Sequence, residues 1–455
     1  MRYPTPRSLF TLLPSLALLA APLTGRGQTP HAEPDDRLRP LSLQQALQAA
    51  LDGNPDLAVA RARSDIAASQ SRGAAAPLWP QLGLDAGYTR STDPVFAFGA
   101  KLRQAAFAQQ DFQVDALNDP DPIGDFSATL AARWGILDPK LWAARAAAKS
   151  QAEAASWSSE RTREATLLLT HTLYYQAMSS QGQLDAARAA LDAATSTVES
   201  FSSRQERGLL TRADLLGAQA EQAAARARLS AAQAARLDAL EDLGRHLGWD
   251  ADSLPLPTDT LSAPESLDEP DFDPRRRADL RALAAAEDAA HAARRQATFS
   301  FVPSVDGFGQ YATHSADVFG FDENDWTVGV MLRWPLFAGF ARFANVQRAQ
   351  AESHIARIRY QEASRDARIE LEQAQRAVRS ARQQVDATQA AREAASSGRD
   401  LMRRRFDEGL ATATDLLQAE ARATAMRQSA IAALANYHIA VARLEFVRSQ
   451  SNRGN

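Results

Sequence analysis

The residues of this chain that could do chemistry are a few acids and histidines, and their spacing forms no catalytic or metal-binding pattern. His171, His291 and His354 fall in helical stretches without a paired ligand one turn further on. We find no phosphate-binding loop, no dinucleotide-binding glycine pattern, no nucleophile elbow and no zinc-protease motif. Cysteine is absent, which excludes thiolate metal sites and catalytic thiols. We therefore expect no enzymatic activity, no cofactor and no metal.

Two aspartates stand out because they belong to a segment that occurs twice. The sequence GLLTRADLL at 208–216 returns as GLATATDLL at 409–417, with Asp214 and Asp415 at matching places. Glycine favours the left-handed end of a helix, and Thr followed by Asp suits the start of the next helix. Each copy lies between long runs rich in Ala, Gln and Arg. We interpret both copies as the tips of helical hairpins.

The runs that lead into the two tips set the scale of the protein. Residues 140–207 and 338–408 would each form a helix roughly 100 Å long at a rise of 1.5 Å per residue. Both runs repeat apolar or small residues every seven positions. Ala177 and Leu184 of the first run correspond to Val378 and Val385 of the second. This pattern predicts long coiled helix pairs, which suit a wall or spacer better than a pocket.

The chain is a tandem duplication, because residues 54–88 align without a gap onto residues 277–311. We expect five parts: a signal peptide at 1–27, a first repeat at 28–249, an acidic and proline-rich linker at 250–274, a second repeat at 275–449 and a tail at 450–455. A membrane anchor is the alternative to a cleaved signal peptide, although about 13 apolar residues are few for a bilayer span.

Each repeat contains two segments in which apolar and polar residues alternate, at about 81–91 and 126–137, and at about 304–314 and 325–337. A period of two is typical of a strand with one apolar and one polar face. Aromatic residues mark the strand ends, as in the girdles of outer-membrane barrels. They are Trp79, Phe126, Trp134, Trp326 and Trp334. A soluble sheet covered by helices is the alternative.

Four strands cannot close a transmembrane barrel, which needs about eight, and open strand edges are not tolerated in lipid. A barrel built from this chain must therefore be shared between protomers, and three protomers would supply twelve strands. The fold class expected is mainly α, with long duplicated hairpins and a small transmembrane β part. Basic and acidic residues nearly balance, at 51 and 55, so nothing favours nucleic acid as a partner.

In their order and duplication these elements resemble the TolC-type outer-membrane factor family, the exit ducts of tripartite efflux pumps and type I secretion systems. The matching pieces are the opening from Leu41-Ser42-Leu43 to Asn54-Pro55, the two strand pairs, the long helix pairs and the repeated tips. The resemblance implies a homotrimer in the outer membrane of a Gram-negative bacterium. Its twelve-stranded β-barrel would continue into a periplasmic α-barrel and would passively conduct small molecules or proteins. The implied partners are a periplasmic adaptor and an inner-membrane pump, either an RND antiporter or an ABC exporter.

The resemblance also implies roles for the tips. Gly208-Leu209 and Gly409-Leu410 would contact the adaptor, and Asp214 and Asp415 would line a closable entrance.

The chain departs from the family pattern at the second tip. Ala411 replaces an expected arginine and Gln418 a second acid, while Arg212 can serve as the basic partner. The alternative for both aspartates is stabilisation of the helix N-terminus. The rival function is a secreted coiled-coil scaffold or adaptor without a pore.

Overall fold

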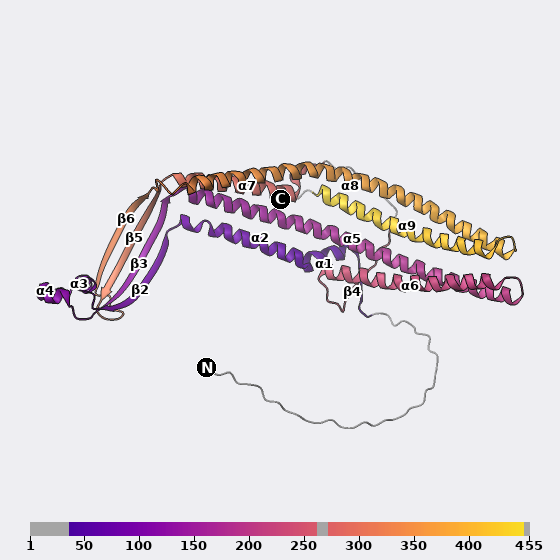
Figure 1. Cartoon of the computed structure of the whole chain (residues 1–455), viewed down its shortest axis with the longest axis horizontal. Helices are drawn as coiled ribbons and strands as arrows, with labels where there is room; N and C mark the ends of the chain where they lie inside the picture. Colours follow the sequence, from indigo (N-terminus) through magenta and orange to yellow (C-terminus); the bar gives the residue numbers. More distant parts are fainter. Residues whose placement is uncertain (1–35, 262–271, 450–455) are drawn as a thin grey trace, which may run out of the picture.

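The computed structural model describes residues 36–261 and 272–449, which form an elongated molecule with a β-sheet at one end and two helical tips at the other (Figure 1). The expected signal peptide and C-terminal tail lie outside the described residues, as does part of the expected linker. The described chain is mostly helical, so the predicted fold class is confirmed.

Two long hairpins make up most of the length. In the first, α5 (Pro139–Glu206) turns back into α6 (Arg212–Leu247), and in the second, α8 (Ala341–Asp407) turns back into α9 (Ala413–Arg448). At 68 and 67 residues, α5 and α8 span about 100 Å each. The expected seam is confirmed, since Ala177, Leu184, Val378 and Val385 are all buried.

Shorter helices cover the part of each long helix that the returning helix does not reach. On the sheet side of α6, α1 (Leu43–Gly53) and α2 (Pro55–Gly73) pack along α5, and α7 (Ala278–Thr298) packs between α5 and α8 (Figure 1). Asn54 ends α1 and caps α2, whose first residue is Pro55. Short 3-10 turns lie at Ala76–Leu78, Pro274–Arg276 and Phe299–Phe301.

The start of the first repeat is tied to the segment that follows α6, which the sequence did not predict. Strand β1 (Leu38–Leu41) pairs in parallel with β4 (Leu254–Pro257). The hydroxyl of the fully buried Tyr174 lies 2.9 Å from Leu41 O and 2.7 Å from Asp259 Oδ2. The first part of the expected linker is therefore held against α5.

The sheet is antiparallel, with strand order β2-β3-β5-β6. Its strands are β2 (Gln81–Ser91), β3 (Ile123–Leu137), β5 (Ser304–Ser315) and β6 (Glu323–Arg333). Strand β6 ends earlier than the expected 337, because Pro335 has no N–H to donate to a ladder. Between β2 and β3, the expected loop contains α3 (Pro94–Arg103), a 3-10 turn (Gln109–Phe112) and α4 (Val114–Asn118).

The register places most apolar residues of the four strands on one face, whereas Phe308 and Met331 lie on the other. Leu84 pairs with Leu130, Leu130 with Tyr311, and Tyr311 with Trp326, and directly opposed residues share a face. The polar residues, such as Thr129 and Gln310, occupy the other face. The apolar face is exposed along its length, with Leu82, Leu84, Trp326, Val328 and Val330 among the most exposed large side chains.

The aromatic residues at the strand ends require one correction. Trp79, Trp134, Trp326 and Trp334 are exposed, and the indole N–H groups of Trp134 and Trp334 donate to Leu78 O and Phe301 O. Phe126, however, is only 5% exposed. The rings of Phe319 and Phe321, from the β5–β6 connection, pack on it at 5.5 and 6.1 Å and are themselves exposed.

Among the described residues, one helix, α9, is long and apolar enough to cross a membrane by length and composition alone. Its apolar side packs against α8 of the same hairpin, and α9 also contacts α5 of the first hairpin. We interpret α9 as a coiled-coil helix rather than as a membrane span.

We expect Tyr174→Phe to loosen the β1–β4 attachment, because it removes a buried hydroxyl from two oxygen partners at a cost of about 1–3 kcal/mol. Limited proteolysis should cut the chain between β4 and α7 faster in the variant than in the native protein. Tyr360→Phe, at a partly exposed position on α8, serves as control. Equal cleavage rates for all three proteins would contradict the anchoring role.

Candidate functional site

The two hairpin tips are built by the same backbone chemistry. Gly208 and Gly409 adopt φ values of +74° and +77°, the left-handed region that favours glycine. At the first tip, Gly208 N–H donates to Gln205 O at 2.9 Å, and Leu209 N–H donates to Arg204 O at 2.9 Å. The second tip repeats both bonds. This pair of bonds is the Schellman ending of a helix, which satisfies its last carbonyls and turns the chain sharply.

The aspartates of the repeated segment cap the returning helices. Asp214 Oδ2 accepts hydrogen bonds from Thr211 N and Thr211 Oγ1, at 3.1 and 2.7 Å. Asp415 Oδ2 accepts from Thr412 N and Thr412 Oγ1, at 3.0 and 2.7 Å. The hydrogen bonds from Thr412 hold the pKa of the Asp415 carboxyl below its ordinary value. Both carboxylates therefore stabilise the N-terminus of their own helix.

The remaining expected tip residues are at the surface. Leu209 and Leu410 are 68% and 64% exposed, so each tip presents an unpaired apolar side chain. Arg212 and Gln418 are also exposed. Within the described part of the chain, Arg212 forms no ion pair with Asp214 or Asp415. The structure thus brings each Thr–Asp pair together but does not join the expected basic partner to them.

Just behind the tips, the two hairpins of the chain contact each other through an apolar cluster. The rings of Phe201 on α5 and Phe406 on α8 lie 5.1 Å apart, and both are buried with Ala413 and Leu416 of α9. Beside them, Arg204 forms an ion pair with Asp407 at 2.6 Å. These residues hold the first hairpin against the second.

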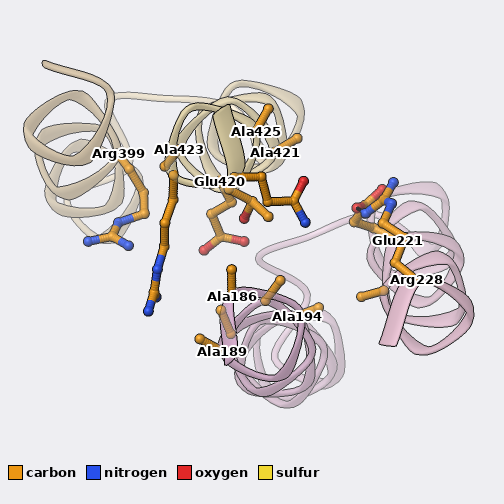
Figure 2. A pocket seen from close by; sticks show the side chains of 16 residues that line it. Ala186, Ala189, Ala194, Glu221, Arg228, Arg399, Glu420, Ala421, Ala423 and Ala425 are labelled. Carbon is orange, nitrogen blue, oxygen red and sulfur yellow. Dashed lines mark hydrogen bonds and ion pairs between the residues drawn. The ribbon is translucent and has the colours of Figure 1, made fainter. Parts of the chain in front are cut away.

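A second contact between the hairpins centres on Glu420, which sequence reasoning missed. Its side chain is 13% exposed and points from α9 towards α5 (Figure 2). Its carboxylate accepts from Thr197 Oγ1 at 3.2 Å and from Arg403 at 3.1 Å. Burial raises the pKa of the Glu420 carboxyl, an effect that Arg403, Thr197 and Arg399 oppose. The sequence gives one sign of this contact: Glu420 is an acid on a face of α9 whose other residues are small or apolar.

Glu420 borders a cavity of about 280 Å³ between the two hairpins. Alanines of α5 and α9 are half of the residues that line it, and the ion-paired Glu221 and Arg228 of α6 lie at one side (Figure 2). Within residues 36–261 and 272–449, no group of three or more His, Cys, Asp or Glu could hold a metal. The hydrogen bonds of Glu420 join α9 to α5 and to α8 beside this cavity.

Comparison with known proteins places this architecture in one family. The model of the outer membrane efflux protein family matches residues 46–249 and 275–447, nearly all of the described chain. The chain belongs to the outer membrane efflux protein family. The matched ranges leave out residues 250–274, the segment that we interpret as the inter-repeat linker.

Individual relatives agree with this assignment. Protein CyaE of Bordetella pertussis (strain Tohama I) is 29% identical over 353 residues, which are 73% of this chain and 69% of CyaE. The outer membrane protein VceC of Vibrio cholerae superposes with a TM-score of 0.76 at 22% identity, over 89% of this chain and 95% of VceC. The CmeC outer membrane channel of Campylobacter jejuni gives a TM-score of 0.76 at 19% identity, over 89% of this chain and 85% of CmeC.

This outer membrane efflux protein is accordingly an outer-membrane channel protein of a Gram-negative bacterium, with a long periplasmic helical part. The predicted family, function and location are confirmed, and the rival scaffold without a pore is not supported. Members of the family form trimeric channels of tripartite efflux systems. The family is one of channels rather than enzymes.

The contact at Glu420 should depend on pH. Because burial raises its pKa, the protonated carboxyl favours the contact, which should be strongest below the ordinary pKa of 4.5 and weaken as the pH rises through the raised value. As the pH rises, the α9 amides near Glu420 should therefore lose protection from hydrogen exchange, after correction for the intrinsic exchange rates. Glu420→Gln should abolish this trend, whereas Glu221→Gln should keep it. An unchanged pH dependence in Glu420→Gln would rule out this carboxyl as its source.

Proposed function

We propose that three copies of this outer membrane efflux protein form one continuous duct. The observation that carries the proposal is the sheet itself. Its apolar face is exposed over all four strands, and β2 and β6 are its two edges. Lipid cannot satisfy the free N–H and C=O groups of a strand edge. Pairing β2 of one protomer with β6 of the next satisfies both edges and produces a closed barrel of twelve strands.

The helical part then continues the duct into the periplasm. Each protomer contributes the two hairpins of its two repeats, 28–249 and 275–449, joined by the linker at 250–274. Transport through such a duct is passive and geometric, and the energy comes from an inner-membrane pump of the RND or ABC class. The cargo is small molecules in an efflux system, or proteins in a type I secretion system.

The tips are the proposed contact and gating sites. Exposed Leu209 and Leu410, each beside its turn glycine, are apolar side chains that a helical hairpin of a periplasmic adaptor can bury. Asp214 and Asp415, with Arg212 and Gln418 near them, would set the charge at the entrance. At the membrane, exposed Trp79, Trp134, Trp326 and Trp334 suit the interfacial girdle. Phe319 and Phe321 take the surface position expected of Phe126.

The duct is tested by a matched pair of substitutions on adjacent residues of β3. Leu130→Lys places a charge on the apolar face and should cost about 2–4 kcal/mol if that face meets the middle of the bilayer. Thr129→Lys places the same charge on the polar face and should cost little. Light scattering in detergent and conductance in planar bilayers should show conducting trimers for the native protein and Thr129→Lys, and few for Leu130→Lys. Native monomers that stay soluble without detergent would refute the proposed function.

The entrance role of Asp415 can be separated from its capping role. Thr412→Ala removes the capping box but leaves the carboxylate, whereas Asp415→Ala removes both. If Asp415 also restricts the entrance, Asp415→Ala should raise single-channel conductance and sensitivity to exported toxic compounds more than Thr412→Ala does. Equal effects of the two variants would leave Asp415 with a capping role alone.

A further inference from the structure

The two connections at the end of the sheet away from the helices differ greatly in length. Strands β5 and β6 are joined by residues 316–322, whereas β2 and β3, their counterparts in the first repeat, are joined by residues 92–122. The shorter connection shows that such a strand pair needs only a few residues to turn. The additional length of residues 92–122, which we call the β2–β3 insert, is therefore not needed for the turn itself.

The β2–β3 insert is a folded unit rather than an open loop. It contains α3 and α4 with a 3-10 turn between them, at the end of the molecule opposite to the hairpin tips (Figure 1). The ring of Phe107 packs on Phe98 at 4.7 Å and on Phe112 at 5.0 Å. Lys101 of α3 forms an ion pair with Asp111 at 2.8 Å. Because these contacts join α3 to the residues that follow it, the position of the insert depends on where α3 is attached.

Helix α3 is attached to the sheet on its polar side. The side-chain amide of Gln104 donates to Asp125 Oδ1 on β3 at 2.8 Å. Asp125 precedes Phe126, which lies on the apolar face, and alternation along the strand puts the Asp125 side chain on the polar face. Ala97 and Ala100, on the same side of α3 as Gln104, are both 1% exposed. The small residues of α3 therefore pack inward beside this attachment.

A line of polar side chains continues from this attachment across the polar face. Asp125 Oδ2 lies 3.0 Å from His314 Nδ1 on β5, and His314 Nε2 lies 3.7 Å from Asp325 Oδ2 on β6. Asp125 and His314 are 4% and 7% exposed, whereas Gln310 and Thr327, further along the same face, are exposed. The polar face is thus covered at the end where α3 is attached and open in its middle.

We infer that three β2–β3 inserts narrow the extracellular exit of the duct, and that the contact Gln104–Asp125–His314 holds each insert in place. The inference rests on the proposed trimer, because the polar face becomes the lumen of the barrel when the apolar face meets lipid. Three copies of α3, each bound on that face, then stand at the mouth of one barrel. The exit sets an upper limit on the size of the cargo, separately from the entrance at the tips.

Asp125 is the residue on which the attachment depends, since its two carboxylate oxygens face α3 and β5 respectively. Asp125→Ala leaves the Gln104 amide and the His314 ring without this partner, which is unfavourable for buried polar groups. Gln104→Leu removes the donor from the insert and leaves the Asp125–His314 pair intact. Asp85→Ala is the matched control, because Asp85 is an exposed carboxylate on the same polar face in the middle of β2.

The test measures how large a reagent can pass the exit of the full-length protein, which has no native cysteine. Gln310→Cys places one thiol on the polar face below the insert. Intact cells are treated from outside with a small maleimide and with maleimides carrying polyethylene glycol of increasing mass. Labelling rates are read on denaturing gels. The three variants and a chain in which residues 92–122 are replaced by a copy of residues 316–322 are compared in this background.

The replacement, Asp125→Ala and Gln104→Leu should each be labelled several-fold faster than the native protein by the large maleimides. Asp85→Ala should match the native protein, and the small maleimide should label all of them at similar rates. Each variant is first shown by light scattering to be a trimer. Gln104→Leu, at a partly buried position, keeps the test available if Asp125→Ala does not assemble.

Equal labelling of the native protein and the replacement by every large maleimide would overturn the inference. If the replacement alone is labelled faster, the holding role of Gln104 and Asp125 is overturned. A thiol that even the small maleimide fails to reach in the replacement would show that the polar face does not line a water-filled lumen. That result would refute the proposed function instead.

Discussion

The organisation of this protein depends on the hydrogen bonds that a lone four-stranded sheet cannot make. Strands β2 and β6 each have one side without a partner, and the same sheet exposes an apolar face from Leu82 to Val330. In water the exposed face is unfavourable, and in lipid the open edges are unfavourable. Association into a closed barrel removes both problems, because it pairs the edges and leaves only the apolar face outside. Closure with further strands is thus a requirement of the sheet, and the proposed trimer meets it.

The helical part meets a different requirement, since it must extend a wall far from the membrane without a thick core. Small residues allow the helices to approach closely. The returning helices α6 and α9 are shorter than α5 and α8, and α1, α2 and α7 pack along the rest of these long helices. At the tips, a glycine with positive φ and the same two backbone hydrogen bonds form the same turn in both repeats. The side chains behind the tips have diverged, however. Thr197 and Gly398, or Phe201 and Met402, occupy matching positions 201 residues apart but are different residue types. The two hairpins therefore have the same backbone turns but different side chains behind them.

Local sequence signals predicted the elements well and the contacts between elements poorly. The heptad at Ala177 and Leu184, the alternation around Leu130 and the Gly–Thr–Asp tips each depend on neighbours in the chain, and each is present in the structure. The β1–β4 pair was missed because two strands of four residues carry too little periodicity to stand out. Phe126 was expected at the surface because it lies on the apolar face of its strand. The two rings that cover it, Phe319 and Phe321, come from a loop almost two hundred residues further along the chain.

The sequence by itself determined the fold class, the duplication, the family resemblance and the position of the tips, because helix periods, strand alternation and turn residues are local and recur at a constant offset. Only the tertiary structure decided which hairpin faces are covered, that Glu420 joins α9 to α5, and that Asp214 and Asp415 are bound within their own capping boxes. The physical reason is the range of the forces involved. A cap or a heptad is set by residues within two turns, whereas burial and the pairing of a carboxylate depend on atoms more than two hundred residues away.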